Sequence, residues 1–168
     1  MALRIVDATE RDVAVILEMI QGLALYEKLA HECVATEEKL RESLFGKQPA
    51  AEVALAYWDE ECAGFALFFP TYSTFLAQRG LYLEDLFVKA HWRGRGIGFA
   101  LLKHLAKIAA ERNCGRVEWG VLNWNEPSIQ FYKRLGAEPM DEWTKYRLTG
   151  EALQKLAVHE QSLEDAAG

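Results

Sequence analysis

The chain has 168 residues, which suits one domain with a single hydrophobic core. Its hydrophobic fraction of 51% and charged fraction of 26% are typical of a soluble globular protein, and no apolar run approaches the ~18 residues of a membrane span. The formal net charge of −6 shows no sign of the basic face that a nucleic-acid-binding protein would carry. We therefore expect one domain over residues 1–168, with disorder from about residue 160, that binds neither membranes nor nucleic acid.

The cysteines are odd in number and scattered, at Cys33, Cys62 and Cys114. None forms the CxxC pair of a zinc ribbon or a redox motif, so we expect three reduced thiols. The N-terminal residues contain no apolar core of signal-peptide length, which favours a cytoplasmic protein. The histidines show no ligand spacing, and we predict no metal site.

The N-terminal part of the chain predicts a strand followed by two helices. The strand spans 3–6, and Thr9 and Asp12 are then spaced like a capping box at the start of a helix that runs to Tyr26. Thr36 is typical of the cap of a second, shorter helix. The first helix is supported by apolar residues at helical spacing, which are Val13, Ile16, Leu17, Ile20, Leu23 and Ala24.

Three strands are predicted next, at 53–58, 63–69 and 81–88. The first two flank an Asp-Glu-Glu turn and therefore indicate a hairpin.

The C-terminal part predicts helices and strands in alternation. The expected elements are an amphipathic helix at 96–112, a strand at 116–121, a helix at 126–135 capped by Asn125, a strand at 145–148 and a helix at 151–158. This order is not a regular βαβ alternation, so the fold class is α+β with a mixed sheet.

The sharpest local feature is the turn Arg93-Gly94-Arg95-Gly96-Ile97-Gly98, between a predicted strand and the long helix. Glycines let an anion approach the backbone closely, and the first amides of a helix have no partner inside it. Those amides and the positive end of the helix dipole favour negative charge. The turn, with its two arginines, therefore predicts a pyrophosphate site.

The glycine turn has three other interpretations. A plain strand-to-helix turn stays open, because glycine-rich turns alone are weak signals. A dinucleotide site is disfavoured although Glu118 lies at a suitable distance, because Phe99 stands where GxGxxG needs its third glycine and the alternative frame ends on Leu101. A P-loop is excluded because the GK[ST] ending is missing.

Two segments resemble the motifs of the GNAT superfamily of N-acetyltransferases. YLEDLFV at 82–88, followed by the glycine turn, is similar to motif A, whose pattern [RQ]xxGx[GA] is filled by Arg93, Gly96 and Gly98. NWNEPSIQFYKRLGA at 123–137 is similar to motif B. Two motifs in the right order, one helix and one strand apart, are far more specific than either alone.

The resemblance is closer to one branch of that superfamily, the diamine (spermidine/spermine N1-) acetyltransferases. It rests on LALYE, YLED and WNEPS, and it extends from Ile5 to about Ala157. It implies the GNAT fold, a twisted and mostly antiparallel sheet splayed near its middle and flanked by helices. It also implies acetyl-CoA as the acetyl donor and a homodimer.

One departure from the spermidine/spermine enzymes lies at the end of the third strand. Those enzymes have Asp-Pro-Trp after a tyrosine, whereas this chain reads Tyr72-Ser73-Thr74-Phe75. The segment resembles instead the sister branch of thialysine acetyltransferases, whose substrates are smaller lysine-like amines. The turn after Trp58 is also shorter than in the spermidine/spermine enzymes.

The resemblance further implies which residues contact the cofactor. The backbone of 86–88 would pair with the pantetheine arm like an added strand, and the Val88 amide is a candidate donor to an oxyanion. The alternative is that these residues are ordinary core of a buried strand. The residues expected to contact acetyl-CoA are Leu86, Phe87, Val88, Arg93, Gly94, Arg95, Gly96, Ile97, Gly98, Phe99, Asn125, Glu126, Pro127 and Ser128.

Glu84 is the candidate general base, acting through water, because an alkylammonium with a pKa of about 10.4 must lose a proton before it attacks. A carboxylate inside an apolar strand is costly unless it has a purpose or a partner. Strict alternation would place Tyr82, Glu84 and Leu86 on one face and Leu83, Asp85 and Phe87 on the other. On that basis Glu84 and Asp85 cannot share one role. A structural carboxylate is the alternative.

Tyr132 is the candidate general acid, because a phenol can protonate a departing thiolate. An aromatic core anchor is the alternative. Tyr26 and Glu27, with Glu84, are expected to receive the cationic substrate.

The sequence thus predicts transfer of an acetyl group from acetyl-CoA to a primary amine of a polyamine, diamine or thialysine-like molecule. A protein or peptide N-acetyltransferase and a non-catalytic acetyl-CoA-binding regulatory domain stay open as alternatives.

Overall fold

The computed structural model describes residues 2–159. The chain divides into two compact units, residues 1–125 and 126–168, and each is considered by itself. The disorder predicted from about residue 160 lies outside the described residues.

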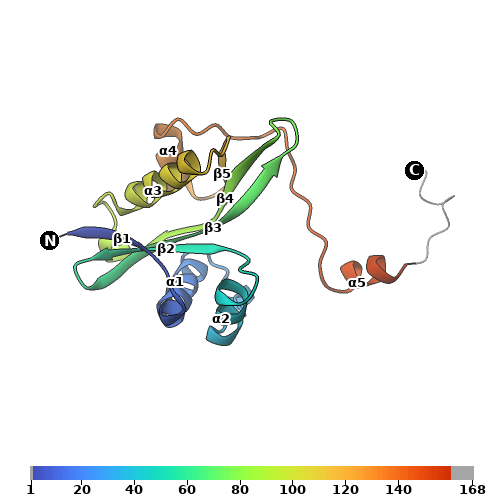
Figure 1. Ribbon diagram of the computed structural model, residues 1–168, viewed down its shortest axis with the longest axis horizontal. Helices are drawn as coiled ribbons and strands as arrows, with labels where there is room; N and C mark the ends of the chain where they lie inside the picture. Colours follow the sequence, from blue (N-terminus) through green and yellow to red (C-terminus); the bar gives the residue numbers. More distant parts are fainter. Residues whose placement is uncertain (1, 160–168) are drawn as a thin grey trace. The chain divides into compact units, whose positions relative to one another are not determined.

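One five-stranded sheet forms the centre of the first unit (Figure 1). The strands follow one another in chain order, and neighbours are antiparallel except for the last pair, which is parallel. The prediction of a mixed, mostly antiparallel sheet is confirmed. The strands are β1 (Leu3–Asp7), β2 (Glu52–Trp58), β3 (Glu61–Ser73), β4 (Gln78–Val88) and β5 (Val117–Trp119).

Helices cover both faces of this sheet, with α1 (Val13–Tyr26) and α2 (Glu37–Phe45) on one face and α3 (Ile97–Glu111) on the other (Figure 1). Short 3-10 turns precede α1, follow it and precede the glycine turn; they are η1 (Glu10–Asp12), η2 (Ala30–Glu32) and η3 (Ala90–Trp92). No helix in the described part of the chain has the length and apolar character to cross a membrane.

Capping side chains fix where the N-terminal helices begin. The Asp12 carboxylate accepts hydrogen bonds from the Thr9 backbone amide at 2.7 Å and from its hydroxyl at 3.1 Å. The Thr36 hydroxyl accepts from the Lys39 amide at 3.2 Å. The Thr36 bond satisfies an amide that the first turn of α2 leaves without a partner, so the predicted start of that helix is confirmed. Thr9 and Asp12 instead cap the 3-10 turn η1, and α1 itself begins at Val13.

The two faces of the sheet differ in side-chain size. Large residues of β2, β3 and β4, among them Leu55, Phe65 and Phe87, pack against α1 and α2. The residues of β2 that alternate with them, Ala54 and Ala56, are fully buried and must point to the opposite face. Their small size lets α3 approach the sheet closely.

β4 is interrupted in its middle at Glu84. On the β3 side, Leu67 opposes Asp85 and Phe68 opposes Leu83, so Glu84 is an extra residue in a β-bulge. On the other side, β5 pairs with β4 only as far as Leu83. From Glu84 onward, none of the described strands pairs with this edge of β4.

The bulge overturns the predicted alternation along β4. Directly opposed residues of an antiparallel pair lie on one face of a sheet. Asp85 therefore shares the α1 face with Leu67, whereas Leu83 shares the α3 face with Phe68. The predicted alternation was wrong, because it assumed a strand without an extra residue. The roles of Glu84 and Asp85 stay predictions.

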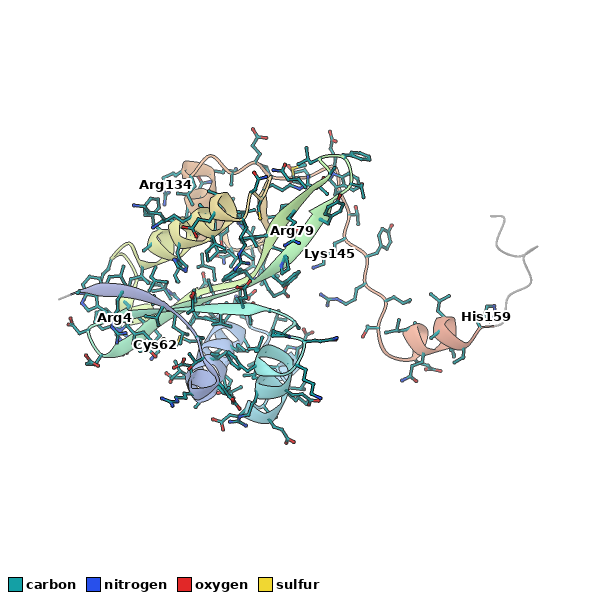
Figure 2. All side chains as sticks on the ribbon, in the orientation of Figure 1. Arg4, Cys62, Arg79, Arg134, Lys145 and His159 are labelled. Atoms are coloured by element: carbon teal, nitrogen blue, oxygen red, sulfur yellow. The ribbon has the colours of Figure 1, made fainter. Side chains whose placement is uncertain are left out.

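The second unit contains α4 (Glu126–Arg134) and α5 (Gly150–Val158), both close to their predicted bounds. The strand predicted at 145–148 is wrong. These residues form no strand, Tyr146 is 90% exposed, and Figure 2 shows Lys145 on an extended stretch of backbone. Apolar alternation alone does not make a segment a strand, because a strand also needs a hydrogen-bonded backbone partner.

Candidate functional site

Three carboxylates lie close together where β4 is interrupted. Glu27 directly follows α1, and Glu84 and Asp85 form the bulge. Burial, together with the negative charges of Glu84 and Glu27, raises the pKa of Asp85 to about 7. Burial and the charge of Glu84 likewise raise the pKa of Glu27. These mutual effects require the three groups to lie within electrostatic range of one another.

In the part of the chain that the structure describes, no positive side chain is paired with this acidic cluster, defined as Glu27, Glu84 and Asp85. Carboxylates that raise one another's pKa are a favourable site for an external cation. Glu27 and Glu84 were predicted, whereas Asp85 was missed. The adjacent acids inside an apolar strand were the available signal for it.

The edge of β4 beyond the bulge carries the backbone groups of Val88. The Lys89 amide donates to the Ala63 carbonyl of β3 at 2.9 Å, so Lys89 points toward the sheet. The Val88 carbonyl instead accepts from Arg93 Nε at 2.9 Å. Because the amide and carbonyl of one strand residue point the same way, the Val88 amide also faces the open edge. That direction suits the donor role predicted for it.

Phe87 shows how one residue can serve both the core and this edge. Its side chain is 8% exposed and packs against α1, where a Cβ on Gly22 would lie only 2.9 Å from the ring. The glycine therefore lets α1 approach β4, and the packed ring holds the adjacent Val88 in place.

The glycine turn fits an anion. Gly94 and Gly96 have φ of +76° and +78°, and a Cβ built on either would meet no atom within 4 Å, so the space beside the turn is open. The first hydrogen bond of α3 runs from the Ala100 amide to the Gly96 carbonyl at 2.9 Å. The three amides before it, those of 97–99, have no acceptor within the helix.

The side chains around the turn have separate positions. Ile97 is 1% exposed and belongs to the core, whereas Phe99 is half exposed. The Arg93 guanidinium lies 4.6 Å from the ring centroid of Tyr26.

Tyr26 has a different environment from the one predicted for a substrate contact. Its hydroxyl donates to Asn125 Oδ1 at 3.0 Å, and its ring lies 6.0 Å from that of Trp124. Asn125 is 7% exposed. Tyr26 therefore links the end of α1 to the segment that precedes α4, and its contact with substrate stays a prediction.

Residues 21–137 match the acetyltransferase (GNAT) family. The chain belongs to that family. It is an N-acetyltransferase, and enzymes of this family use acetyl-CoA as the acetyl donor.

Curated relatives match this acetyltransferase over most of its length. It is 37% identical to the thialysine N-epsilon-acetyltransferase of Mus musculus, over 92% of this chain and 96% of the relative. It is 34% identical to the L-ornithine N5-acetyltransferase of Arabidopsis thaliana, over 89% of this chain and 85% of the relative. Among solved structures, an integron cassette protein of V. cholerae superimposes with a TM-score of 0.81 at 29% identity, covering 95% of this chain and 99% of the other.

The second unit of this acetyltransferase carries the remaining predicted residues. Glu126, Pro127 and Ser128 form the first turn of α4, and the Glu126 carboxylate accepts from Gln130 Nε2 at 2.6 Å. The ring of Tyr132 lies 5.6 Å from that of Phe131. The roles of these residues stay predictions.

A cavity of about 400 Å³ lies between the middle of α1 and the end of β4. It is lined by Glu18, Gly22, Tyr26, Phe87, Lys89 and Arg93, among others.

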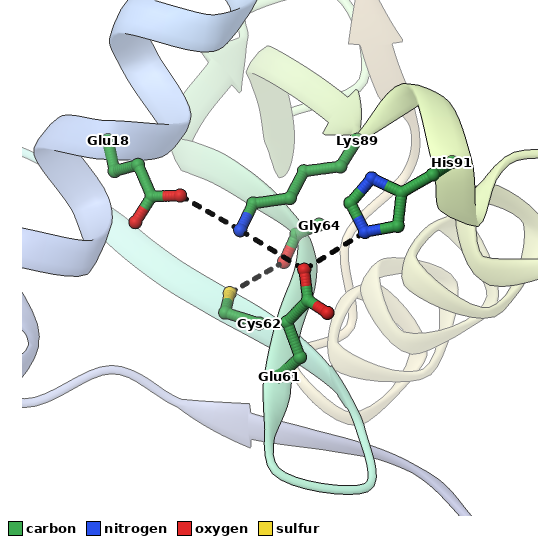
Figure 3. Close-up of polar contacts among 6 residues, drawn as sticks. All are labelled: Glu18, Glu61, Cys62, Gly64, Lys89 and His91. Atoms are coloured by element: carbon green, nitrogen blue, oxygen red, sulfur yellow. Dashed lines mark hydrogen bonds and ion pairs between the residues drawn. The ribbon is translucent and has the colours of Figure 1, made fainter.

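Three residues that line this cavity, Glu18, Lys89 and His91, form a network of ion pairs with Glu61 (Figure 3). Lys89 Nζ lies 2.8 Å from Glu18 and 3.5 Å from Glu61, which in turn lies 3.0 Å from His91. Burial alone would lower the pKa of Lys89, but the hydrogen bond and charge of Glu18 and the charge of Glu61 raise it. These groups satisfy one another, so the network of ion pairs links α1 and β3 to the residues that directly follow β4.

Proposed function

We propose that this enzyme transfers the acetyl group of acetyl-CoA to a primary amine of a small cationic substrate. The observation that carries the proposal is the acidic cluster of Glu27, Glu84 and Asp85, which has no ion-pair partner among the described residues. It adjoins the open edge of β4, where the Val88 amide is directed outward. Glu27 and neighbouring residues of β4 thereby supply a site for the cationic substrate and a backbone donor.

We infer that the acceptor is a lysine-like amine rather than spermidine. Curated relatives that match nearly the whole chain are named for thialysine and ornithine, which both carry an amine on an amino-acid side chain. The segment after β3 supports the same class. Ser73 is buried, and its hydroxyl accepts from the Leu76 amide at 3.3 Å, so it builds the hairpin turn and supplies no charge for a polyamine.

Acetyl-CoA would supply an activated acetyl thioester. Two features fit it. The turn with Gly94 and Gly96 has an open side and helix amides that suit a pyrophosphate. The edge of 86–88 that faces away from β3 pairs with no described strand and suits an extended arm. Asn125 and the first turn of α4 would complete the contacts.

The chain's own groups then have distinct tasks. Glu84 accepts a proton from the ammonium group through water, which leaves a neutral nucleophile. The Val88 amide stabilises negative charge on the carbonyl oxygen as the amine attacks. Tyr132 donates its phenolic proton to the departing thiolate and regains a proton from the second one that the nitrogen loses as the amide forms.

The test is an assay of thiol release from acetyl-CoA with thialysine, lysine, ornithine, spermidine and lysine-containing peptides. We expect the highest kcat/KM for the free amino acids and at least about tenfold less for spermidine. A preference for peptides would assign the enzyme to the protein-modifying class. Binding of acetyl-CoA without turnover of any amine would refute the catalytic proposal.

Tyr132→Phe tests the general acid, because it removes the proton donor and keeps the ring. We expect kcat to fall about a hundredfold or more, with little change in the affinity for acetyl-CoA. Phe131→Leu is the matched control on the same helix. Full activity of Tyr132→Phe would mean that water, and not Tyr132, donates the proton.

We also propose a homodimer, as the family resemblance implies. Sedimentation velocity at micromolar concentration tests it directly, and a single monomeric species would contradict it.

A further inference from the structure

Lys28 lies in the turn that ends α1, in a backbone conformation that is unusual for lysine. Its φ is +62°, in the left-handed region that favours glycine or asparagine at the end of a helix. The chain turns back here, since the Lys28 amide donates to the Leu25 carbonyl at 3.2 Å and the Leu29 amide to the Ala24 carbonyl at 2.8 Å. A residue with a Cβ is strained in this region, and such strain is often kept where a side chain has a function.

The ammonium group of Lys28 lies over an indole ring. Its Nζ is 4.7 Å from the ring centroid of Trp124, which is itself 6.0 Å from the ring of Tyr26. The neighbouring Asn125 is 7% exposed and accepts a hydrogen bond from the Tyr26 hydroxyl, so the segment that carries Trp124 is fastened to the end of α1. The cation–π contact therefore gives an exposed lysine a defined position.

The charge of Lys28 is not used by the acidic cluster beside it. Lys28 directly follows Glu27, so their Cα atoms are only about 3.8 Å apart. Yet burial and the charge of Glu84 raise the pKa of Glu27, whereas a paired ammonium group would lower it. Lys28 forms no ion pair with any residue that the structure describes. Glu32 of the following turn η2 lies 4.0 Å from His31 instead.

Two other positive side chains near α1 have partners of their own. Lys89 is paired with two glutamates. The Arg93 Nε donates to the Val88 carbonyl, at the edge proposed for acetyl-CoA. Lys28 therefore stands beside the acidic cluster with its charge open to an external anion.

A lysine-like acceptor carries charges of both signs. Its side-chain ammonium is the group to be acetylated, and the other end of the molecule has an α-carboxylate. The acidic cluster attracts the ammonium group but repels this carboxylate. A diamine or polyamine has no carboxylate, so a cation next to the cluster favours the amino acid and disfavours the other amines.

We propose that Lys28 binds the α-carboxylate of the acceptor and makes this enzyme selective for basic amino acids over diamines of the same length. Trp124 is a positioning residue that holds the ammonium group of Lys28. This inference rests on the proposed transfer to a lysine-like amine and assigns the residue that recognises its amino-acid end.

The test compares lysine with cadaverine, which is lysine without its carboxylate, in the thiol-release assay of the full chain. We expect the unaltered enzyme to have a kcat/KM for lysine at least about fivefold above that for cadaverine. Lys28→Met keeps the length of the side chain and removes its charge. It should raise the KM for lysine about threefold to thirtyfold, because an ion pair is lost, whereas the KM for cadaverine should stay the same or fall.

Matched substrates and variants separate the charge from other effects. Ornithine and putrescine form a second pair that differs only in the carboxylate, and lysinamide, whose carboxylate is replaced by a neutral amide, should behave like cadaverine. Lys28→Arg keeps the charge and should retain most of the preference for lysine. Lys107→Met removes one positive charge from the exposed surface of α3 and should leave both KM values as they are.

Trp124→Leu tests the positioning role. It should raise the KM for lysine about twofold to fivefold, with little effect on cadaverine, because the cation–π contact is lost. Trp124→Phe should restore the preference, since an aromatic face remains. A purely structural role of Trp124 would affect both substrates equally.

Three results would overturn the proposal. These are a kcat/KM for lysine no higher than that for cadaverine in the unaltered enzyme, equal losses for both substrates in a folded Lys28→Met, and a preference for lysine that Lys28→Met leaves unchanged. Each of them leaves transfer to a primary amine standing. If the enzyme binds acetyl-CoA but acetylates no member of either pair, the proposed function fails as well. Circular dichroism shows whether Lys28→Met is folded, and Lys28→Gln is the second neutral replacement.

Discussion

The two halves of β4 belong to one strand but behave differently. Residues 78–83 lie next to β3, and the last three of them also pair with β5, so Leu81 and Leu83 are buried at 1% and 2% exposure. Residues 84–88 begin with an unpaired bulge and pair only with β3. The acidic cluster and the outward Val88 amide lie in this second half.

This difference indicates that the proposed site depends more on the irregular pairing of residues 84–88 than on the types of residue in them. An unpaired strand edge offers backbone donors and acceptors to an extended ligand. A bulge changes the direction of side chains, and here it brings Glu84 and Asp85 together. The regular half supplies the rigid base from which the irregular half extends.

The strongest test of this difference is Glu84→Gln in the irregular half. The substitution keeps the shape of the side chain but removes the proton acceptor, so we expect kcat/KM to fall about a hundredfold or more. Steady-state kinetics across pH 6 to 10 measures the effect.

Glu118→Gln is the matched control for that experiment. Glu118 lies on β5 opposite the regular half, and its carboxylate is 3.1 Å from Arg116. We expect near-normal kinetics. If Glu84→Gln keeps both the rate and the pH profile, the base is water or another residue.

Leu83→Ala, in the regular half, should lower the stability of the enzyme and leave its kcat nearly unchanged. Leu83 is 2% exposed, and shortening a buried leucine costs about 2–5 kcal/mol in the free energy of unfolding. Urea denaturation measures that loss. The kcat of the folded fraction should stay within about twofold of normal, because the side chain faces α3 and not the acidic cluster. A large fall in kcat would show that the two halves are coupled.

Asp85→Asn tests the carboxylate that the bulge adds to the cluster. With a pKa of about 7, Asp85 is neutral in acid and negative above neutrality. The KM for the amine should therefore rise as the pH falls below 7 in the unaltered enzyme. Asp85→Asn should raise KM about tenfold at pH 8 and flatten this dependence, since one attractive charge is absent at every pH.

The same group predicts how stability depends on pH. In the unfolded chain Asp85 ionises near pH 3.8, whereas in the folded enzyme it keeps its proton up to about pH 7. Between these values the folded state binds more protons, so stability falls as pH rises, by up to about 1.4 kcal/mol per pH unit. Asp85→Asn should remove this slope in urea denaturation. An unchanged slope would assign the dependence to other groups.

Most of the fold could be predicted from the sequence because local patterns matched the elements. The helix of 13–26 has both its apolar spacing and its Asp12 bond, and the glycine turn is followed by α3 as expected. The strand predicted at 145–148 failed because its pattern gave no information about a backbone partner.

The acidic cluster shows how much of the candidate site could be predicted from the sequence. Glu27 and Glu84 could be named from the family resemblance, but Asp85 could not, because a register shift depends on the residues opposite. The environment of Tyr26 could not be predicted from the sequence either, because its partner Asn125 lies 99 positions away in the chain.

Two glycines give the most discriminating comparison, Gly64 on β3 beside the irregular half of β4 and Gly80 within the regular half. A Cβ on Gly64 would lie 2.6 Å from the Phe87 carbonyl oxygen, next to the site. A Cβ on Gly80 would lie 2.8 Å from the Thr71 hydroxyl, in the regular half. Each alanine substitution should lower the free energy of unfolding by about 1–3 kcal/mol, because the neighbouring atoms must move.

The two variants should differ in catalysis. Gly64→Ala displaces the strand beside Val88, so we expect kcat to fall about threefold to tenfold, because small misplacements of a backbone donor reduce the rate. Gly80→Ala should keep kcat near normal in the folded fraction. A kcat near normal in both variants would mean that the position of Val88 does not limit the reaction. Equal losses would mean that strain passes through the bulge, and that the halves of β4 differ in structure but not in function.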